Sequence, residues 1–157
     1  FVKELAKDGL EVFDQTALIR SLMPAPGVLT KRKPTPQEQQ DMEFGMKMAR
    51  EIGRLDVGQT VVVKQQAVMA LEAIEGTDAC IRRGGELARG GAVVAKTAKP
   101  NQDLRFDVPA VGMKTMEIMV EVGASALVIE AGRTLLVEKD KVIALAEAHD
   151  ITIVAME

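Results

Sequence analysis

Aromatic, thiol and imidazole side chains are nearly missing from this 157-residue chain, which has no Trp, no Tyr, four Phe, one Cys and one His. So few rings leave little to stack on single-stranded nucleic acid, and a net charge of -3 provides no broad basic surface for a duplex. Cys80 cannot form an internal disulfide, and it falls on an apolar helical position, which predicts a buried thiol in a reducing, cytosolic setting. With only Cys80 and His149 available, neither a thiol triad nor a His-rich zinc site has enough parts.

Long apolar runs are also lacking. The longest uncharged apolar stretch, Val122 to Ile129, is far shorter than the roughly 18 residues that span a bilayer, so any membrane contact is expected to be peripheral. The first residues mix charges with apolar side chains and have no continuous apolar centre of a signal peptide. Because the chain starts with Phe1, we expect a processed or truncated protein. The glycine-rich loop motifs of mononucleotide and dinucleotide sites are not found either.

Prolines divide the chain into three parts. Residues 1–23 resemble the tail of a neighbouring unit, and Pro24 to Pro36 holds four of the six prolines, a composition typical of an extended linker. The linker ends at Thr35, which is followed three residues later by Glu38, the signature of a capping box. Residues 37–157 are large enough for one compact domain.

In this domain, apolar spacing predicts an α/β fold. Helices are expected at 36–52, 76–83, 112–123 and 140–150, the second ending at Gly84-Gly85 and the last capped by Asp140. Strands are expected at 60–64, 68–73, 92–98, 126–130, 134–138 and 151–156, with one hairpin about Gln65-Gln66 and another about Ala131-Gly132. The pattern therefore predicts a sheet of mixed parallel and antiparallel strands with interleaved helices and two hairpins.

The most charged short segment follows Pro100. If it is extended, Asp103, Arg105 and Asp107 share one face, and Gln102 lies on the other. Two carboxylates can hold a hard divalent cation, and a guanidinium between them can bind a phosphate through two hydrogen bonds. A solvated strand edge with weak ion pairs explains the same alternation about equally well.

Two further clusters could take part in chemistry. In the segment from Glu72 to Asp78, acids flank a glycine and a helix start, where free backbone amides favour anions. The alternative is that Thr77 or Asp78 only caps the helix, and for this segment alone that alternative is favoured. Glu130 and Arg133 enclose a glycine turn, for which a turn salt bridge is a sufficient explanation.

Four blocks in order, LDVGQTVVVK, EAIEGTDACIRRGG, KTAKPNQDLRFDVPAVG and VIEAGRTLLVEKD, resemble the C-terminal domain of the LpxI family, the UDP-2,3-diacylglucosamine pyrophosphatases of lipid A biosynthesis. The resemblance extends from Pro24 to Glu157. It implies that 1–23 is the remnant of an N-terminal domain, 24–36 a linker and 37–157 a catalytic domain. It also implies a Mg²⁺-dependent hydrolase that cleaves UDP-2,3-diacylglucosamine into UMP and 2,3-diacylglucosamine 1-phosphate, at a site that both domains form.

The resemblance assigns roles to individual residues. It implies that Asp103 handles the metal with Asp107 second, and that Glu75 joins these two as a catalytic residue. The residues that it implies as substrate or phosphate contacts are Thr77, Asp78, Lys96, Lys99, Gln102, Arg105 and Arg133.

Two other functions remain open at this stage: a binding module that holds lipid or nucleotide without turnover, and a dimerisation domain. The partners expected are the UDP-diacylglucosamine lipid, the enzyme's own N-terminal domain, the inner-membrane surface in passing contact and, as an open question, a second copy of the chain. A cytoplasmic location, with peripheral contact to the inner membrane, follows from the same resemblance.

Overall fold

The computed structural model describes residues 7, 9, 19–100 and 107–157, and in them the predicted mixed α/β fold is confirmed. Six strands form one sheet in the order β1-β8-β6-β4-β2-β3. Strands β4, β6 and β8 are parallel, and the outer pairs are antiparallel. The strands of this sheet are β1 (Gly27–Val28), β2 (Thr60–Lys64), β3 (Ala67–Leu71), β4 (Val93–Lys96), β6 (Ala126–Glu130) and β8 (Thr152–Met156). Two short strands, β5 (Ala110–Val111) and β7 (Leu135–Leu136), form a separate parallel pair.

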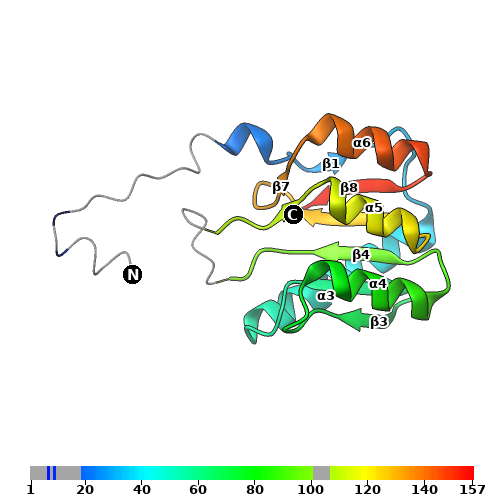
Figure 1. The fold of residues 1–157 in the computed structure, drawn as a ribbon, viewed down its shortest axis with the longest axis horizontal. Coiled ribbons are helices and arrows are strands. Elements are labelled where there is room, and N and C mark those ends of the chain that lie inside the picture. The colour runs from blue at the N-terminus through cyan, green and yellow to red at the C-terminus, as the bar shows by residue number, and fades with distance from the viewer. Residues whose placement is uncertain (1–6, 8, 10–18, 101–106) are drawn as a thin grey trace.

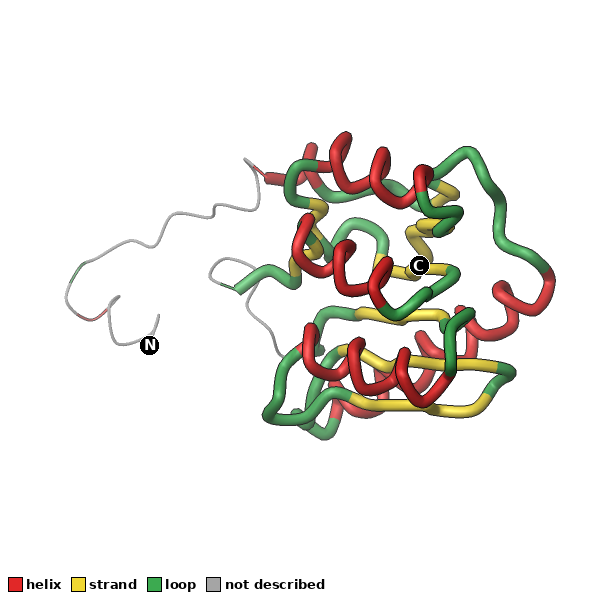
Figure 2. Tube along the Cα trace, turned by 45° about the vertical axis from the view of Figure 1, so that its right-hand side comes forward, coloured by secondary structure: helices red, strands yellow, loops and turns green. Residues whose placement is uncertain are grey.

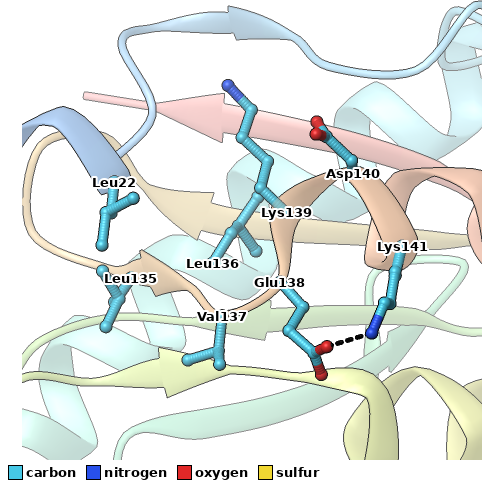
Figure 3. Close-up of a pocket in the computed structure, with 8 residues that line it drawn as sticks. All are labelled: Leu22, Leu135, Leu136, Val137, Glu138, Lys139, Asp140 and Lys141. Carbon is cyan, nitrogen blue, oxygen red and sulfur yellow. Dashed lines mark hydrogen bonds and ion pairs between the residues drawn. The ribbon is translucent and has the colours of Figure 1, made fainter.

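The helices of the described residues cover both faces of the sheet (Figures 1 and 2). They are η1 (Arg20–Leu22), α3 (Pro36–Arg54), α4 (Thr77–Ala88), α5 (Met113–Glu121) and α6 (Lys139–Ala148). Helix α3 alone packs on one face, while α4, α5 and α6 lie on the other. Alternate residues of β4 follow this division: Val93 and Ala95 pack under α3, and Val94 joins the larger core on the opposite side.

The start of α3 confirms the predicted capping box. The Thr35 hydroxyl accepts a hydrogen bond from the Glu38 backbone amide at 3.2 Å, and the Glu38 carboxylate accepts one from the Thr35 amide at 2.8 Å. Pro36 begins the helix without losing a bond that the helix needs. Met42 and Met46 are buried at core positions, as their spacing predicts.

The prediction that α4 ends at Gly84-Gly85 is wrong. The helix continues to Ala88, because these two glycines are sites of close packing and not of termination. A Cβ at Gly84 would lie 2.5 Å from the Cβ of Val62, and one at Gly85 would lie 2.3 Å from Cγ2 of Val122. The missing side chains let α4 approach β2 and the end of α5.

One predicted hairpin is confirmed, and the second is wrong. Strands β2 and β3 pair around Gln65 and Gln66, both of which have positive φ angles as their turn requires. The buried carboxylate of Asp41 accepts hydrogen bonds from both of their amides, at 2.9 and 2.7 Å. By contrast, β7 pairs with β5 and not with β6, since β6 lies between β4 and β8 and has no free edge.

Residues 24–36, predicted as a linker, lie against the sheet. Strand β1 pairs with β8, and the Thr30 hydroxyl accepts a bond from the Ile153 amide at 3.1 Å. Arg32 bonds both oxygens of Glu38 and the carbonyls of Ser125 and Asp150. This segment is therefore part of the packed fold, while the proposed division of the chain into domains stays a prediction.

The last helix begins one residue before the position predicted to cap it. Asp140 lies in the first turn of α6, and the cap position is occupied by Glu138, which has a φ of 53°. The strand predicted to follow the helix is confirmed as β8. Within the described residues, no helix is both long and apolar enough to cross a bilayer.

Candidate functional site at the carboxyl end of the sheet

The carboxyl ends of the three parallel strands share one edge of the molecule. Helices α4, α5 and α6 begin at that same edge, on the left in Figure 1. Open α/β sheets bind ligands beyond the carboxyl ends of their strands. The first turn of each helix also presents backbone amides without intrahelical partners, and these amides favour anions.

Lys96, the last residue of β4, is the buried cation of this edge. Its side chain follows Val94 onto the α4 face, and the residue is only 5% exposed. Nζ donates to Oγ1 of Thr77 at 3.1 Å and to the carbonyl of Ala110 at 3.0 Å. Burial lowers the pKa of this ammonium, against the opposing charges of Glu72, Asp78 and Asp107. Among the described residues, its direct hydrogen-bond partners are neutral.

Thr77, the first residue of α4, connects Lys96 to a buried acid. Its hydroxyl lies 3.2 and 3.3 Å from the two carboxylate oxygens of Glu72 and 3.3 Å from Oγ1 of Thr60. Glu72 is 7% exposed and Thr60 is fully buried. These four residues, Lys96, Thr77, Glu72 and Thr60, are called the polar cluster below.

Asp78 joins the first turns of two helices. Its carboxylate accepts a bond from the Thr115 hydroxyl at 3.0 Å and lies 3.0 Å from Nζ of Lys114. Because Thr115 and Lys114 belong to α5, the contact fixes the N-termini of α4 and α5 side by side. The structure thus gives Asp78 a bridging contact, next to the predicted role as a substrate contact.

Glu75 is turned toward the surface of α4. Its carboxylate accepts hydrogen bonds from its own amide, from Arg83 and from the amide of Ala73, and these bonds lower its pKa. Arg83 also donates to the carbonyl of Leu71 at 3.0 Å. None of these bonds connects Glu75 to the polar cluster within the described residues. Its catalytic role stays a prediction.

Arg133 and Lys99, two of the predicted contacts, are in ion pairs. Glu130, the last residue of β6, accepts a bond from the Ala98 amide at 3.0 Å, and its other oxygen is 3.7 Å from Arg133 and 3.9 Å from Arg50. Glu130 follows Val128 onto the α3 face, away from Lys96. Nζ of Lys99 is 2.7 Å from Oδ1 of Asp56. The predicted site residues are therefore distributed over both faces of the sheet.

The charged segment after Pro100 is described only in part. Asp103, Gln102 and Arg105 lie outside the described residues, so their roles stay predictions. Asp107 is described, and its carboxylate is exposed at the edge that holds Lys96.

The acidic side chains of the described residues do not form a complete metal site. No group of three or more His, Cys, Asp or Glu side chains that could hold a metal is found in residues 19–100 and 107–157. Mg²⁺ retains several waters and is often held by one or two carboxylates together with substrate phosphates. Among the described residues of this edge, the exposed carboxylate of Asp107 is an oxygen donor of that kind.

Glu72 was not among the predicted site residues. Its position one residue after β3 marks it as a candidate site residue, because an acid at the end of an apolar strand points either to solvent or into a polar pocket. Sequence alternation cannot distinguish these outcomes, because the choice depends on Thr77 and Lys96 from other elements. The predicted burial of Cys80 is confirmed, and burial raises the pKa of its thiol to about 12.

Most of the chain matches a known protein family. Residues 25–154 match the family profile described as the LpxI C-terminal domain. Over 152 residues the chain is 40% identical to the UDP-2,3-diacylglucosamine pyrophosphatase LpxI of Caulobacter vibrioides. The aligned region covers 92% of this chain and 54% of the Caulobacter protein. The chain thus spans about half the length of this curated relative. A solved structure of Acinetobacter baumannii RibD aligns with a TM-score of 0.44 at 16% identity, over 75% of this chain and 35% of the other.

Proposed function

This chain belongs to the LpxI family, and from that membership we propose that it is the C-terminal domain of an enzyme that hydrolyses the pyrophosphate bond of UDP-2,3-diacylglucosamine. In the reaction, water attacks one phosphorus atom and the bridging P–O bond breaks. The products are UMP and 2,3-diacylglucosamine 1-phosphate, and the proton lost by water is released to the medium. The observation that carries the proposal is the buried ammonium of Lys96, which lies beside the start of α4 and is not directly paired with any carboxylate of the described residues.

The residues of the carboxyl edge supply what this hydrolysis needs. A pyrophosphate carries negative charge that must be offset as the bridging oxygen departs. Lys96 and the first-turn amides of α4 offer positive charge at fixed positions, since Thr77 and Ala110 hold the ammonium in place. Low exposure strengthens these interactions, because little water screens them.

We propose that Mg²⁺ takes part, with Asp103 and Asp107 as its carboxylate ligands. When bound, the ion would neutralise phosphate charge and orient the attacking water. Lys96 would then contact a phosphate oxygen, and Arg105 would add a second contact. Thr77 and Asp78 would set the position of the helix start that faces the phosphate.

The substrate is amphiphilic, so we also propose that the enzyme works in the cytoplasm and touches the inner-membrane surface only peripherally. Salt or carbonate washing of membranes should remove the protein. Retention through both washes would contradict peripheral contact.

The test uses the two-domain enzyme with UDP-2,3-diacylglucosamine, and UMP release is measured as Mg²⁺ is titrated. Asp103→Ala should lose roughly a hundredfold in turnover while remaining folded. Near-normal turnover of that variant at saturating Mg²⁺ would end the metal assignment and move attention to Glu75 and Asp78. Binding of lipid without any UMP release by the unmodified enzyme would favour the alternative, a binding module.

A further inference from the structure

The hydrogen-bond directions in the polar cluster are fixed by chemistry. Lys96 can only donate, so the Thr77 hydroxyl accepts from it. An ionised Glu72 can only accept, so the single proton of Thr77 is donated to this carboxylate. Thr60 must then donate to Thr77, because the proton of Thr77 is already used. Each hydroxyl in the cluster is left with one orientation.

This order depends on the charge of Glu72. If Glu72 were uncharged, its side chain could donate as well as accept, and the Thr77 hydroxyl could turn its proton toward Thr60. The Thr77 oxygen would then no longer be fixed as the acceptor of the hydrogen bond from Lys96. Thr77 and Ala110 occupy two of the three N–H groups of Lys96, and the third has no acceptor among the described residues.

The charged groups around Lys96 come from three segments. Glu72 precedes α4, Asp78 lies in its first turn, and Asp107 precedes β5. Asp78 is paired with Lys114 of α5, and Asp107 is exposed to solvent. Glu72 is therefore the only one of these three acids that is both buried and linked to Lys96 through a single intervening atom, Oγ1 of Thr77.

We propose that Glu72 is a positioning residue of the anion site: through Thr77 it orients the Lys96 ammonium, keeps it charged and directs its remaining N–H toward a phosphate oxygen. The inference deepens the proposed function, on which it rests for the identity of the anion. Glu72 itself does not touch the phosphate. Thr77 and Lys96 lie between the Glu72 carboxylate and the bound phosphate. Glu72 therefore stabilises the Lys96 ammonium without repelling the phosphate at short range.

The test measures binding of inorganic pyrophosphate to the 157-residue chain by calorimetry, at about pH 7 and about pH 9. Glu72→Gln keeps the size and an acceptor oxygen but removes the charge. Because the opposing charge of Glu72 is lost in this variant, Lys96 should release its proton at lower pH. At pH 7 the dissociation constant for pyrophosphate should therefore stay within about threefold of that of the unmodified chain. At pH 9 binding should be about tenfold weaker than in the unmodified chain. Glu86→Gln is the matched control, since Glu86 is an exposed acid of α4, the helix that follows Glu72.

Each variant is compared with the unmodified chain at the same pH, so that protonation of pyrophosphate itself cancels. Identical pH profiles of Glu72→Gln and Glu86→Gln would overturn the positioning role. A second pair of variants probes the hydroxyl: Thr77→Val should lose pyrophosphate binding and Thr77→Ser should retain it. Equal binding by these two variants would also contradict the proposal.

One measurement needs no variant. In the unmodified chain with labelled lysines, pyrophosphate should raise the NMR titration midpoint of Lys96 and leave that of Lys141 unchanged. An unaffected Lys96 would overturn the inference. Failure of the proposed function has a different outcome: the two-domain enzyme would release no UMP, while the pyrophosphate results on this chain would stay as expected.

Discussion

One cation lies at the amino ends and another at the carboxyl ends of the parallel strands, and their hydrogen-bond partners differ in charge. Arg32, at the amino ends of β6 and β8, bonds both oxygens of Glu38 and the backbone carbonyls of Ser125 and Asp150. Lys96, at the carboxyl end of β4, is more deeply buried, and in the described part of the chain its hydrogen-bond partners are a hydroxyl and a carbonyl. The first charge is fully used by the fold, whereas the second has bonding capacity left for a ligand. Direct pairing with a carboxylate thus distinguishes Arg32, whose charge the fold uses, from Lys96, for which we propose a role in ligand binding.

The largest expected effect comes from removing the second cation. Lys96→Met in the two-domain enzyme should lower turnover by roughly a hundredfold or more, because a fixed charge that offsets the phosphate is lost. Stability should change little, since the burial cost of the ammonium disappears together with two hydrogen bonds. Turnover and melting temperature are measured together. A strongly lowered melting temperature with normal turnover would reverse the assignment of the two cations.

Removing the first cation should do the opposite. Arg32→Met should lower the free energy of unfolding by about 2 kcal/mol, because Glu38 is left partly buried without its partner. Denaturant titration gives the value, and turnover of the folded enzyme should be unchanged. Trypsin should then cut near Lys31 and Lys33 faster than in the unmodified protein. Equal digestion rates would mean that Arg32 does not hold this segment to the sheet.

The pH dependence of stability distinguishes the two ends by sign. Burial alone would raise the pKa of Glu38, but the hydrogen bonds from Arg32 and Thr35 outweigh burial, and the pKa is lowered. The stabilising contribution of Glu38 is therefore present above about pH 4.5 and is lost as the pH falls through the lowered pKa. The pKa of Lys96 is also lowered, so its destabilising contribution is complete below that lowered value and fades as pH rises toward 10.5. Denaturation of Glu38→Gln should show a weaker acid limb, and that of Lys96→Met a weaker alkaline rise. Unchanged limbs in both variants would contradict these assignments.

The smallest effect is expected where an arginine is paired but exposed. Arg54 bonds Glu51 one turn earlier in α3, and both side chains are more than half exposed. Arg54→Met should therefore change the free energy of unfolding by about 0.5 kcal/mol or less. The same denaturant titration measures it beside Arg32→Met. A loss as large as that of Arg32→Met would show that exposure does not decide the value of these pairs.

Local sequence signals predicted most elements of the fold. The capping box of Thr35 and Glu38 and the turn at Gln65-Gln66 depend on residues close in sequence, so they were found. The end of α4 was not found. Gly84 is required for close packing against Val62 of β2, and the sequence alone does not place that strand beside the helix. The pairing of β7 with β5 was missed for the same reason.

The candidate site was predictable to a smaller extent. Family resemblance indicated Lys96 and Thr77, and the structure brings them within 3.1 Å. It did not indicate Glu72, whose importance depends on burial and on bond direction. It grouped Arg133 and Lys99 with them, although the structure places Arg133 with Glu130 on the α3 side and pairs Lys99 with Asp56. The face of the sheet on which a charge lies depends on tertiary structure.

The contact between β1 and β8 also has a consequence for biosynthesis. Thr30 bonds Ile153, 123 residues later in the chain. On a ribosome, the early segment must wait until the last strand has emerged before its hydrogen bonds can form. Contacts of such long range raise the contact order and slow folding. We therefore expect Arg32 and its neighbours to stay accessible to proteases and chaperones until β8 has been synthesised, and to become protected only when β1 pairs with β8.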